Sequence, residues 1–186
     1  MSETEKVLIR DARRTDARLI AWALTESFHF EHDAQEEERL REMVERDDTL
    51  YSYRHARVAE VDGVVVGSQT AYTGREYAAG RKECFQHVWP YITDAMVAEA
   101  PMESDEDEYH MEGIGILPKY RGWGISRLLI MDSVKRGQNR GYKKVAFLVA
   151  ADSEGLMSYY ERLGFRRTER LTLFDIDYIK MQYGQG

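Results

Sequence analysis

Residues 114–126 carry the clearest signal in the 186-residue chain: Ile114-Gly-Ile-Leu-Pro-Lys-Tyr-Arg-Gly-Trp-Gly-Ile-Ser126. A strand-like run ends near Pro118, and a turn with glycines at 122 and 124 leads directly into a helical pattern. Glycine lets backbone N–H groups converge because it has no Cβ, and the start of a helix favours an anion. The stretch therefore predicts a strand–turn–helix element that binds an anion, although a purely structural turn would have the same local pattern.

The helix expected after this turn has one face of mostly small residues. The members of that face recur at helical spacing: Ser126, Leu129, Ile130, Ser133 and Gly137. Because three of these side chains are very small, we expect the helix to lie unusually close to a sheet and to hold its first amides rigidly.

Two common phosphate-binding motifs are excluded by their spacing. A P-loop requires G-x-x-x-x-G-K-[ST], and the chain has no lysine at that place. Gly113 and Gly115 begin the pattern of a dinucleotide-binding turn, but Pro118 occupies its last glycine position. The anion must therefore be bound by another kind of turn.

Strands and helices alternate along the rest of the chain. A hairpin is expected at 54–72, because Asp62-Gly63 suits the positive φ angles of a type I′ turn. Other strands are expected at 7–10, 109–117, 144–150, 171–173 and 178–181, and helices at 31–48, 125–137 and 154–163. Residues 73–107 are the least regular part and stay unassigned, apart from a short helix at 91–100. The pattern predicts one domain, residues 1–186, with a mixed sheet in a layered α/β fold.

Composition excludes several classes of protein. The chain has 26 Lys and Arg against 33 Asp and Glu, a net charge of −7, which argues against a general nucleic-acid binder. Cys84 is the single cysteine, so an internal disulfide or a multi-cysteine zinc site is excluded, and we expect no metal site. The N-terminal residues are polar, and no run approaches the ~18 apolar residues of a membrane span. We therefore expect a cytoplasmic protein without membrane partners.

The charges are separated along the chain. An acidic stretch, residues 98–112, has seven carboxylates and no Lys or Arg, whereas a basic stretch, residues 119–144, has eight Lys and Arg and one acid. Acidic runs are most often solvated. Two opposed fields side by side would also suit a site for an anionic cofactor and a cationic substrate.

Three motifs in the second half of the chain resemble one protein family. Arg121-x-x-Gly124-x-Ser126 resembles the Arg/Gln-x-x-Gly-x-Gly/Ala element of the GNAT superfamily of acetyl-CoA-dependent N-acetyltransferases. Residues 159–165, Tyr-Tyr-Glu-Arg-Leu-Gly-Phe, are similar to its helix-then-Gly-Phe element, and 177–181 resemble a common last strand. The resemblance is specific over about 108–183 and implies a single mixed, mostly antiparallel central sheet flanked by helices.

The resemblance also implies where acetyl-CoA binds. The backbone amides of the turn would hold its pyrophosphate, and the pantetheine arm would pair with the splayed end of the preceding strand. Ser153 stands where many members carry Asn, and Ser126 where Gly or Ala is usual. The expected cofactor-binding residues are Ile114, Gly115, Ile116, Arg121, Gly122, Trp123, Gly124, Ile125, Ser126, Arg127 and Ser153.

Acetyl transfer to an amine needs a base, an oxyanion stabiliser and an acid for the departing thiolate. Glu108, His110 and Glu112 alternate along one expected strand and share a face unless a bulge intervenes. The resemblance favours Glu112 as the base, while His110 has the more suitable ordinary pKa, and the choice stays open. It also implies a backbone N–H near Ile116 as oxyanion stabiliser and Tyr160 as the acid; helical spacing predicts packing for the neighbouring Tyr159.

These features together predict an enzyme that transfers an acetyl group to the primary amine of a small cationic molecule. The acidic stretch and several aromatic residues could line the acceptor pocket: Phe28, Phe30, Tyr72, Tyr77, Phe85, Trp89 and Tyr91. One alternative is acetylation of a protein N-terminus or lysine, which an open acidic groove would favour. Another is a non-catalytic module that binds acyl-CoA. The resemblance is also compatible with a homodimer.

Overall fold

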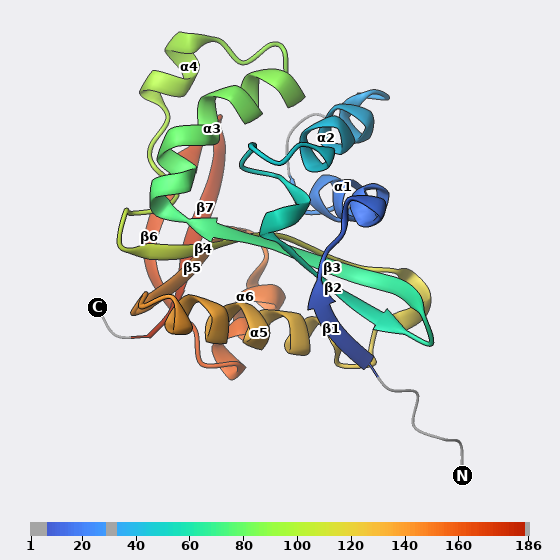
Figure 1. Cartoon of the computed structure of the whole chain (residues 1–186). Coiled ribbons are helices and arrows are strands. Elements are labelled where there is room, and N and C mark those ends of the chain that lie inside the picture. Colours follow the sequence, from blue (N-terminus) through green and yellow to red (C-terminus); the bar gives the residue numbers. More distant parts are fainter. Residues whose placement is uncertain (1–6, 29–32, 185–186) are drawn as a thin grey trace.

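The computed structural model describes residues 7–28 and 33–184, and its core is a twisted seven-stranded sheet (Figure 1). The strand order is β1-β2-β3-β4-β5-β7-β6, with β4 and β5 as the one parallel pair among the antiparallel ones. The predicted mixed, mostly antiparallel sheet is confirmed. The strands are β1 (Val7–Asp11), β2 (Ala56–Val61), β3 (Val64–Thr73), β4 (Glu108–Ile116), β5 (Lys144–Ala150), β6 (Arg166–Leu173) and β7 (Ile176–Tyr183).

Helices cover both faces of the sheet (Figure 1). One face carries α1 (Ala17–Thr25), α2 (Glu36–Glu45), α3 (Gly74–Val88) and α4 (Asp94–Glu99), and the other carries α5 (Ile125–Asn139) and α6 (Glu154–Arg162). Each layer buries its own set of apolar side chains against the sheet. Within the described residues, no helix is both long and apolar enough to cross a membrane.

The predicted hairpin is present as β2 and β3. Asp62 and Gly63 connect the two strands with φ angles of 50° and 79°. Positive φ at both central residues is the signature of a type I′ turn, whose twist matches that of the flanking strands. This hairpin brings β3 to the middle of the sheet, beside β4.

The stretch at 73–107 is more regular than expected, because it contains the 15-residue helix α3. Thr73 and Glu76 form a reciprocal capping box at its start. The Glu76 nitrogen lies 3.1 Å from the Thr73 Oγ1, and the Thr73 nitrogen lies 2.7 Å from the Glu76 Oε2. A Cβ on Gly74 would lie 1.8 Å from the carbonyl oxygen of Asp105, so only glycine allows this helix start to touch the segment before β4. Gly74 and Gly80 therefore belong to a packed helix.

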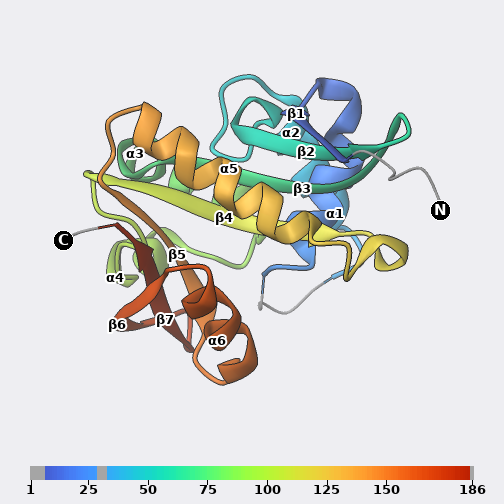
Figure 2. The ribbon, with the colours of Figure 1, turned by 90° about the horizontal axis from the view of Figure 1, so that it is seen from below.

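A bulge in β4 opens the sheet at its centre. Gln69 pairs with Ile114, but Ala71 pairs with Met111, so β4 has one residue more than β3 in this interval. β5 pairs with β4 only over residues 108–110 and then turns away from it (Figure 2). The diverging strands leave a gap between the two helix layers, with α5 on one side and α1 on the other.

Candidate active site

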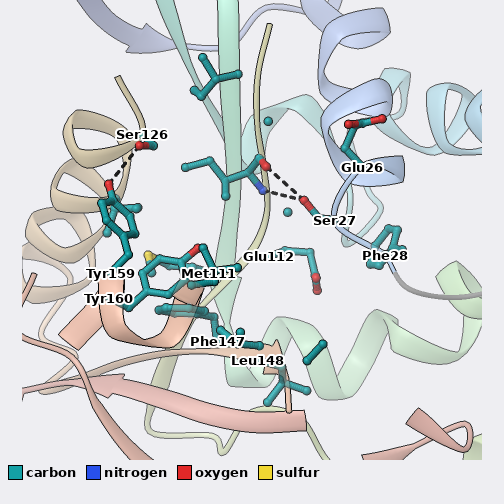
Figure 3. Close-up of a pocket in the computed structure, with 18 of the residues that line it drawn as sticks. Glu26, Ser27, Phe28, Met111, Glu112, Ser126, Phe147, Leu148, Tyr159 and Tyr160 are labelled. Atoms are coloured by element: carbon teal, nitrogen blue, oxygen red, sulfur yellow. Dashed lines mark hydrogen bonds between the residues drawn. The ribbon is translucent and has the colours of Figure 1, made fainter. Parts of the chain in front are cut away.

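A cavity of about 840 Å³ occupies the gap between β4 and β5 (Figure 3). Its walls come from the end of α1, the second half of β4, the turn before α5, the last residues of β5 and α6. Phe85, Glu103, Leu173 and Tyr178 line the end near Glu112, whereas the turn at 120–127 lines the other. The cavity thus joins the predicted anion-binding turn to the predicted catalytic strand.

The glycine turn has the geometry of an anion cradle. Gly122 and Gly124 have φ angles of 84° and 77°, which residues with a Cβ rarely adopt. Gly124 is the N-cap of α5, and no side chain caps the helix, so its first N–H groups face the cavity end without a side-chain acceptor. Arg121 and Arg127 line the same end and add positive charge.

The small-residue face of α5 lies against the sheet as expected. Leu129, Ile130, Ser133 and Gly137 are buried, and a Cβ on Gly137 would lie 2.8 Å from the ring of Tyr109 in β4. Close packing without a side chain at this point fixes the helix start relative to β4. The packing of α5 on β4 therefore fixes the position of the turn that precedes this helix.

The backbone of β4 offers hydrogen-bonding groups to the cavity. The N–H of Leu117 donates to the carbonyl oxygen of Val66 in β3 at 2.8 Å. Since alternate residues of a strand bond to opposite neighbours, the N–H groups of Ile114 and Ile116 point away from β3, toward the gap. Ser27 at the end of α1 reaches Ile114, with its Oγ 3.0 Å from the amide nitrogen and 3.2 Å from the carbonyl oxygen (Figure 3).

Glu112 lines the cavity, and the side chains of Glu103 and His110 lie close to it. The Tyr72 hydroxyl donates to its Oε2, and the His110 Nε2 lies 3.8 Å from the same oxygen. One ligand atom each of Glu103, His110 and Glu112 lies within 4.8 Å of the others, a spacing that suits one small cation. Burial and the neighbouring Glu103 carboxylate raise the pKa of Glu112 to about 8, although the hydrogen bond from Tyr72 acts against them.

The other two candidate bases do not line the cavity. Glu108 accepts hydrogen bonds from the buried Lys180 ammonium at 3.2 Å and from the backbone N–H of Asp105 at 3.0 Å. His110 packs against both Tyr72 and Tyr77, with ring centroids at 5.4 and 6.0 Å. Burial and the charge of Lys180 lower the pKa of His110 to about 3, so its ring is neutral at physiological pH.

Two neighbouring tyrosines of α6 line the cavity opposite β4 (Figure 3). Tyr160 is buried against Phe147 and Phe165, and this burial raises the pKa of its hydroxyl, which therefore stays protonated. The Tyr159 hydroxyl lies 3.0 Å from the Ser126 Oγ in the first turn of α5. Tyr159, expected only to pack, thus also joins α6 to the anion-binding turn.

Most of the acidic stretch lies outside the cavity, contrary to its expected place in the acceptor pocket. Asp107 pairs with Lys144 at 3.0 Å, and Glu106 is exposed beside Arg75 at 3.6 Å. Only Glu103 and Glu112 of this stretch line the cavity. The reason is that the chain turns after Glu103, and the following carboxylates meet basic residues at the surface or the Lys180 ammonium.

Other predictions for the site differ in detail. Trp123 and Ser153 do not line the cavity; Trp123 is exposed and packs edge-on against Tyr120, with ring centroids 5.3 Å apart. Of the aromatic candidates for the acceptor pocket, Phe28 and Phe85 line the cavity. Phe30 lies outside the described residues.

Sequence reasoning missed several residues that the fold brings to this site. Glu103 appeared only as one charge of the acidic stretch, Tyr178 only as part of the expected last strand, and Ser27 carried no motif at all. The contact between Glu103 and Glu112 depends on how α3 packs, which no local spacing reveals. The clearest available signal for Glu103 was its place in an unassigned segment between predicted elements.

The splayed strands, the anion-binding turn and the carboxylate opposite a tyrosine would suit a transferase that takes a phosphate-bearing donor. The sequence model of the acetyltransferase (GNAT) family matches residues 17–165. The chain belongs to this family, as the motifs predicted, and acetyl-CoA is the donor that the family uses.

Known relatives match shorter segments. The chain is 41% identical over 58 residues to N-alpha-acetyltransferase 30 of Schizosaccharomyces pombe, covering 31% of this chain and 39% of that protein. It is 37% identical over 67 residues to glucosamine 6-phosphate N-acetyltransferase of Trypanosoma brucei brucei, covering 36% and 44%. The matches thus span less than half of either relative. An N-acetyltransferase structure from Staphylococcus aureus Mu50 has a TM-score of 0.68 at 22% identity, with 94% and 99% of the chains covered, which shows the shared fold.

The residues present fit acetyl-CoA. The turn offers backbone N–H groups and two arginines to a pyrophosphate, and Gly122 and Gly124 have open space where a Cβ would stand. The N–H of Ile116 faces the gap, where an extended pantetheine arm could be added as a strand. The bound donor would supply an activated acetyl thioester and a thiol leaving group.

Replacement of Gly124 by valine should weaken CoA binding by about 5- to 150-fold, because a β-branched residue at this φ costs about 1–3 kcal/mol or forces the turn to rearrange. Isothermal titration calorimetry measures the change. Gly155→Ala, in open space within α6, is the matched control and should bind CoA normally. Equal affinity of G124V and the unmodified chain would contradict the assignment of this turn to the pyrophosphate.

Proposed function

We propose that this chain transfers an acetyl group from acetyl-CoA to the primary amine of a small cationic molecule. The observation that carries the proposal is the single cavity with an anion-binding turn at one end and a buried carboxylate, Glu112, near the other. Arg121 and Arg127 suit the anionic donor, and Glu103 and Glu112 suit a cationic acceptor. Family membership supports the reaction class.

Glu112 is proposed as the base that receives a proton from the acceptor nitrogen on its carboxylate oxygen. Its raised pKa brings it closer to that of an alkylammonium group, which makes the proton transfer less uphill. Glu108 is held by Lys180 away from the cavity, and neutral His110 would be a far weaker base. The geometry therefore favours Glu112 among the three candidates.

Tyr160 is proposed as the acid, and the N–H of Ile116 as the oxyanion stabiliser. The Tyr160 hydroxyl would give its proton to the departing sulfur and recover one from the acetylated nitrogen. The proton accepted by Glu112 would pass to solvent, so that one proton is released per turnover. The Ile116 N–H is directed into the gap, where it could face the carbonyl oxygen of the acetyl group.

The apolar lining near Glu112 supports a small acceptor with an apolar body. Phe85, Leu173 and Tyr178 line this part of the cavity. The named relatives include one whose name specifies protein N-termini and one that names a sugar amine, so both classes occur among similar proteins. The homodimer stays a prediction.

Release of free thiol from acetyl-CoA across a panel of amines tests the proposal. We expect turnover with small primary alkylamines and little with peptides that present a free N-terminus. Turnover with peptides alone would favour the protein-acetylating alternative. Saturable CoA binding without thiol release on any amine would favour the non-catalytic module.

A further inference from the structure

The acceptor end of the cavity contains a carboxylate that the reaction scheme leaves without a role. Glu103 lies in the segment between α4 and β4, and its side chain is almost fully buried. The Tyr77 hydroxyl donates to its Oε1 at 2.7 Å. Arg81 anchors the same segment by donating to the carbonyl oxygens of Ala100 and Pro101 at 3.0 and 2.9 Å. Glu103 is thus held rigidly by α3, next to Glu112.

The two carboxylates face a part of the cavity that lacks a positive charge. Among the described lining residues, the only Lys or Arg side chains are Arg121 and Arg127, which belong to the turn at the far end. Lys180 lies behind the cavity wall and pairs with Glu108 at 3.2 Å. Arg81 and Lys180 act on Glu103 from behind the wall, whereas no described Lys or Arg side chain lines the cavity beside Glu112. A cationic acceptor would therefore bring the missing positive charge to the pair from the cavity side.

Glu103 and Glu112 differ in how readily they ionise. Arg81, Lys180 and the Tyr77 hydroxyl all favour the ionised form of Glu103, although burial raises the pKa of this carboxyl. The groups near Glu112 are Glu103, His110 and the tyrosines at 51, 72 and 178, none of which is a cation at neutral pH. Glu103 therefore keeps a negative charge more readily, and Glu112 is the better proton acceptor.

Among the described residues, the other side chains that line this end are apolar or aromatic. They are Phe28, Phe85, Leu173 and Tyr178. Such a wall suits a hydrocarbon or aromatic body attached to the amine. An acceptor with a phosphate or carboxylate close to its amine would bring a negative charge toward two carboxylates and is disfavoured.

We propose that Glu103 determines acceptor specificity: it binds the ammonium group of a cationic amine with an apolar body, while the neighbouring Glu112 accepts the proton. This inference rests on the proposed function. In the step, one N–H bond of the ammonium group breaks, its electron pair stays on nitrogen, and the proton forms a bond to a Glu112 oxygen. Glu103 remains ionised throughout and balances the charge.

The test compares Glu103→Gln with the unmodified chain, using 2-phenylethylamine as the cationic probe and 4-(2-aminoethyl)benzoate as its zwitterionic analogue. EDTA in the buffer prevents a divalent ion from occupying the same atoms. We expect E103Q to raise KM for 2-phenylethylamine by about 10- to 100-fold, the loss of one charge-assisted hydrogen bond. The amine dissociation constant from calorimetry should rise in parallel, with CoA affinity unchanged. Glu106→Gln, an exposed member of the same acidic stretch, is the control.

Two further readouts separate binding from structure. Removal of the Glu103 charge should move the acidic limb of kcat/KM down by about one pH unit, because Glu112 then loses its carboxylate neighbour. The unmodified chain should also discriminate against the benzoate analogue. This comparison does not depend on the folding of any variant. Unchanged KM and pH limb in E103Q, or a preference of the unmodified chain for the zwitterionic analogue, would overturn the proposal. Absence of CoA binding or of thiol release with every amine would instead contradict the proposed function.

Discussion

Replacement of Glu112 by glutamine is expected to lower kcat/KM by about 10²- to 10⁴-fold, the usual contribution of a general base. Glutamine keeps the size of the side chain and can still accept the hydrogen bond from Tyr72, so the cavity should keep its shape. The variant cannot accept a proton from the acceptor nitrogen. Steady-state thiol release over a range of primary-amine concentrations measures the effect.

The pH profile gives the same residue a second, independent signature. Burial and the Glu103 carboxylate raise the pKa of Glu112 to about 8, and only the ionised form accepts a proton. In the unmodified chain kcat/KM should therefore fall about tenfold per pH unit below that value and level off above it. E112Q should lose this limb. Glu99→Gln, an exposed position at the end of α4, should keep both rate and limb. A full-rate E112Q enzyme with the same limb would rule out Glu112 as the base.

Replacement of Tyr160 by phenylalanine should reduce kcat by about 10²-fold or more while leaving CoA affinity unchanged. The ring still packs against Phe147 and Phe165, so the loss is confined to the hydroxyl that protonates the thiolate. Burial keeps this hydroxyl protonated by raising its pKa. Steady-state thiol release gives the change in kcat, and calorimetry verifies CoA binding.

Tyr159→Phe is the matched control for this acid. It removes a neighbouring hydroxyl in the same helix and the contact with Ser126, but not the proposed proton donor. Its kcat should stay near that of the unmodified chain. Full turnover by Y160F, or an equal loss in Y159F, would contradict the assignment of Tyr160.

Much of the fold could be predicted from local patterns. The residues at the Asp62-Gly63 turn and the glycines at 122 and 124 permit positive φ angles. Such backbone preferences depend only on residues close in the sequence. The small face of α5 likewise follows from spacing alone, and Gly137 against Tyr109 explains it. These features place the anion-binding turn without any knowledge of tertiary contacts.

The acceptor end could not be predicted in the same way. Helix α3 contains glycines that lower its intrinsic propensity, and Gly74 is required by a contact with Asp105 that only the folded chain makes. Glu103 meets Glu112 because Tyr77 and Arg81 on α3 hold its segment in place. Sequence spacing could not distinguish Glu103 from its neighbours in the acidic stretch, since long-range packing decides which of them is buried.

The most direct test of the central claim is calorimetric titration of the unmodified chain with acetyl-CoA. The site predicts saturable binding of one molecule per chain, weakened in G124V and competed by CoA. Binding of this kind would tie the turn at 121–126 to the donor, whatever the acceptor proves to be. No detectable binding of acetyl-CoA or CoA by the folded chain would contradict the proposed acetyl transfer at its first step.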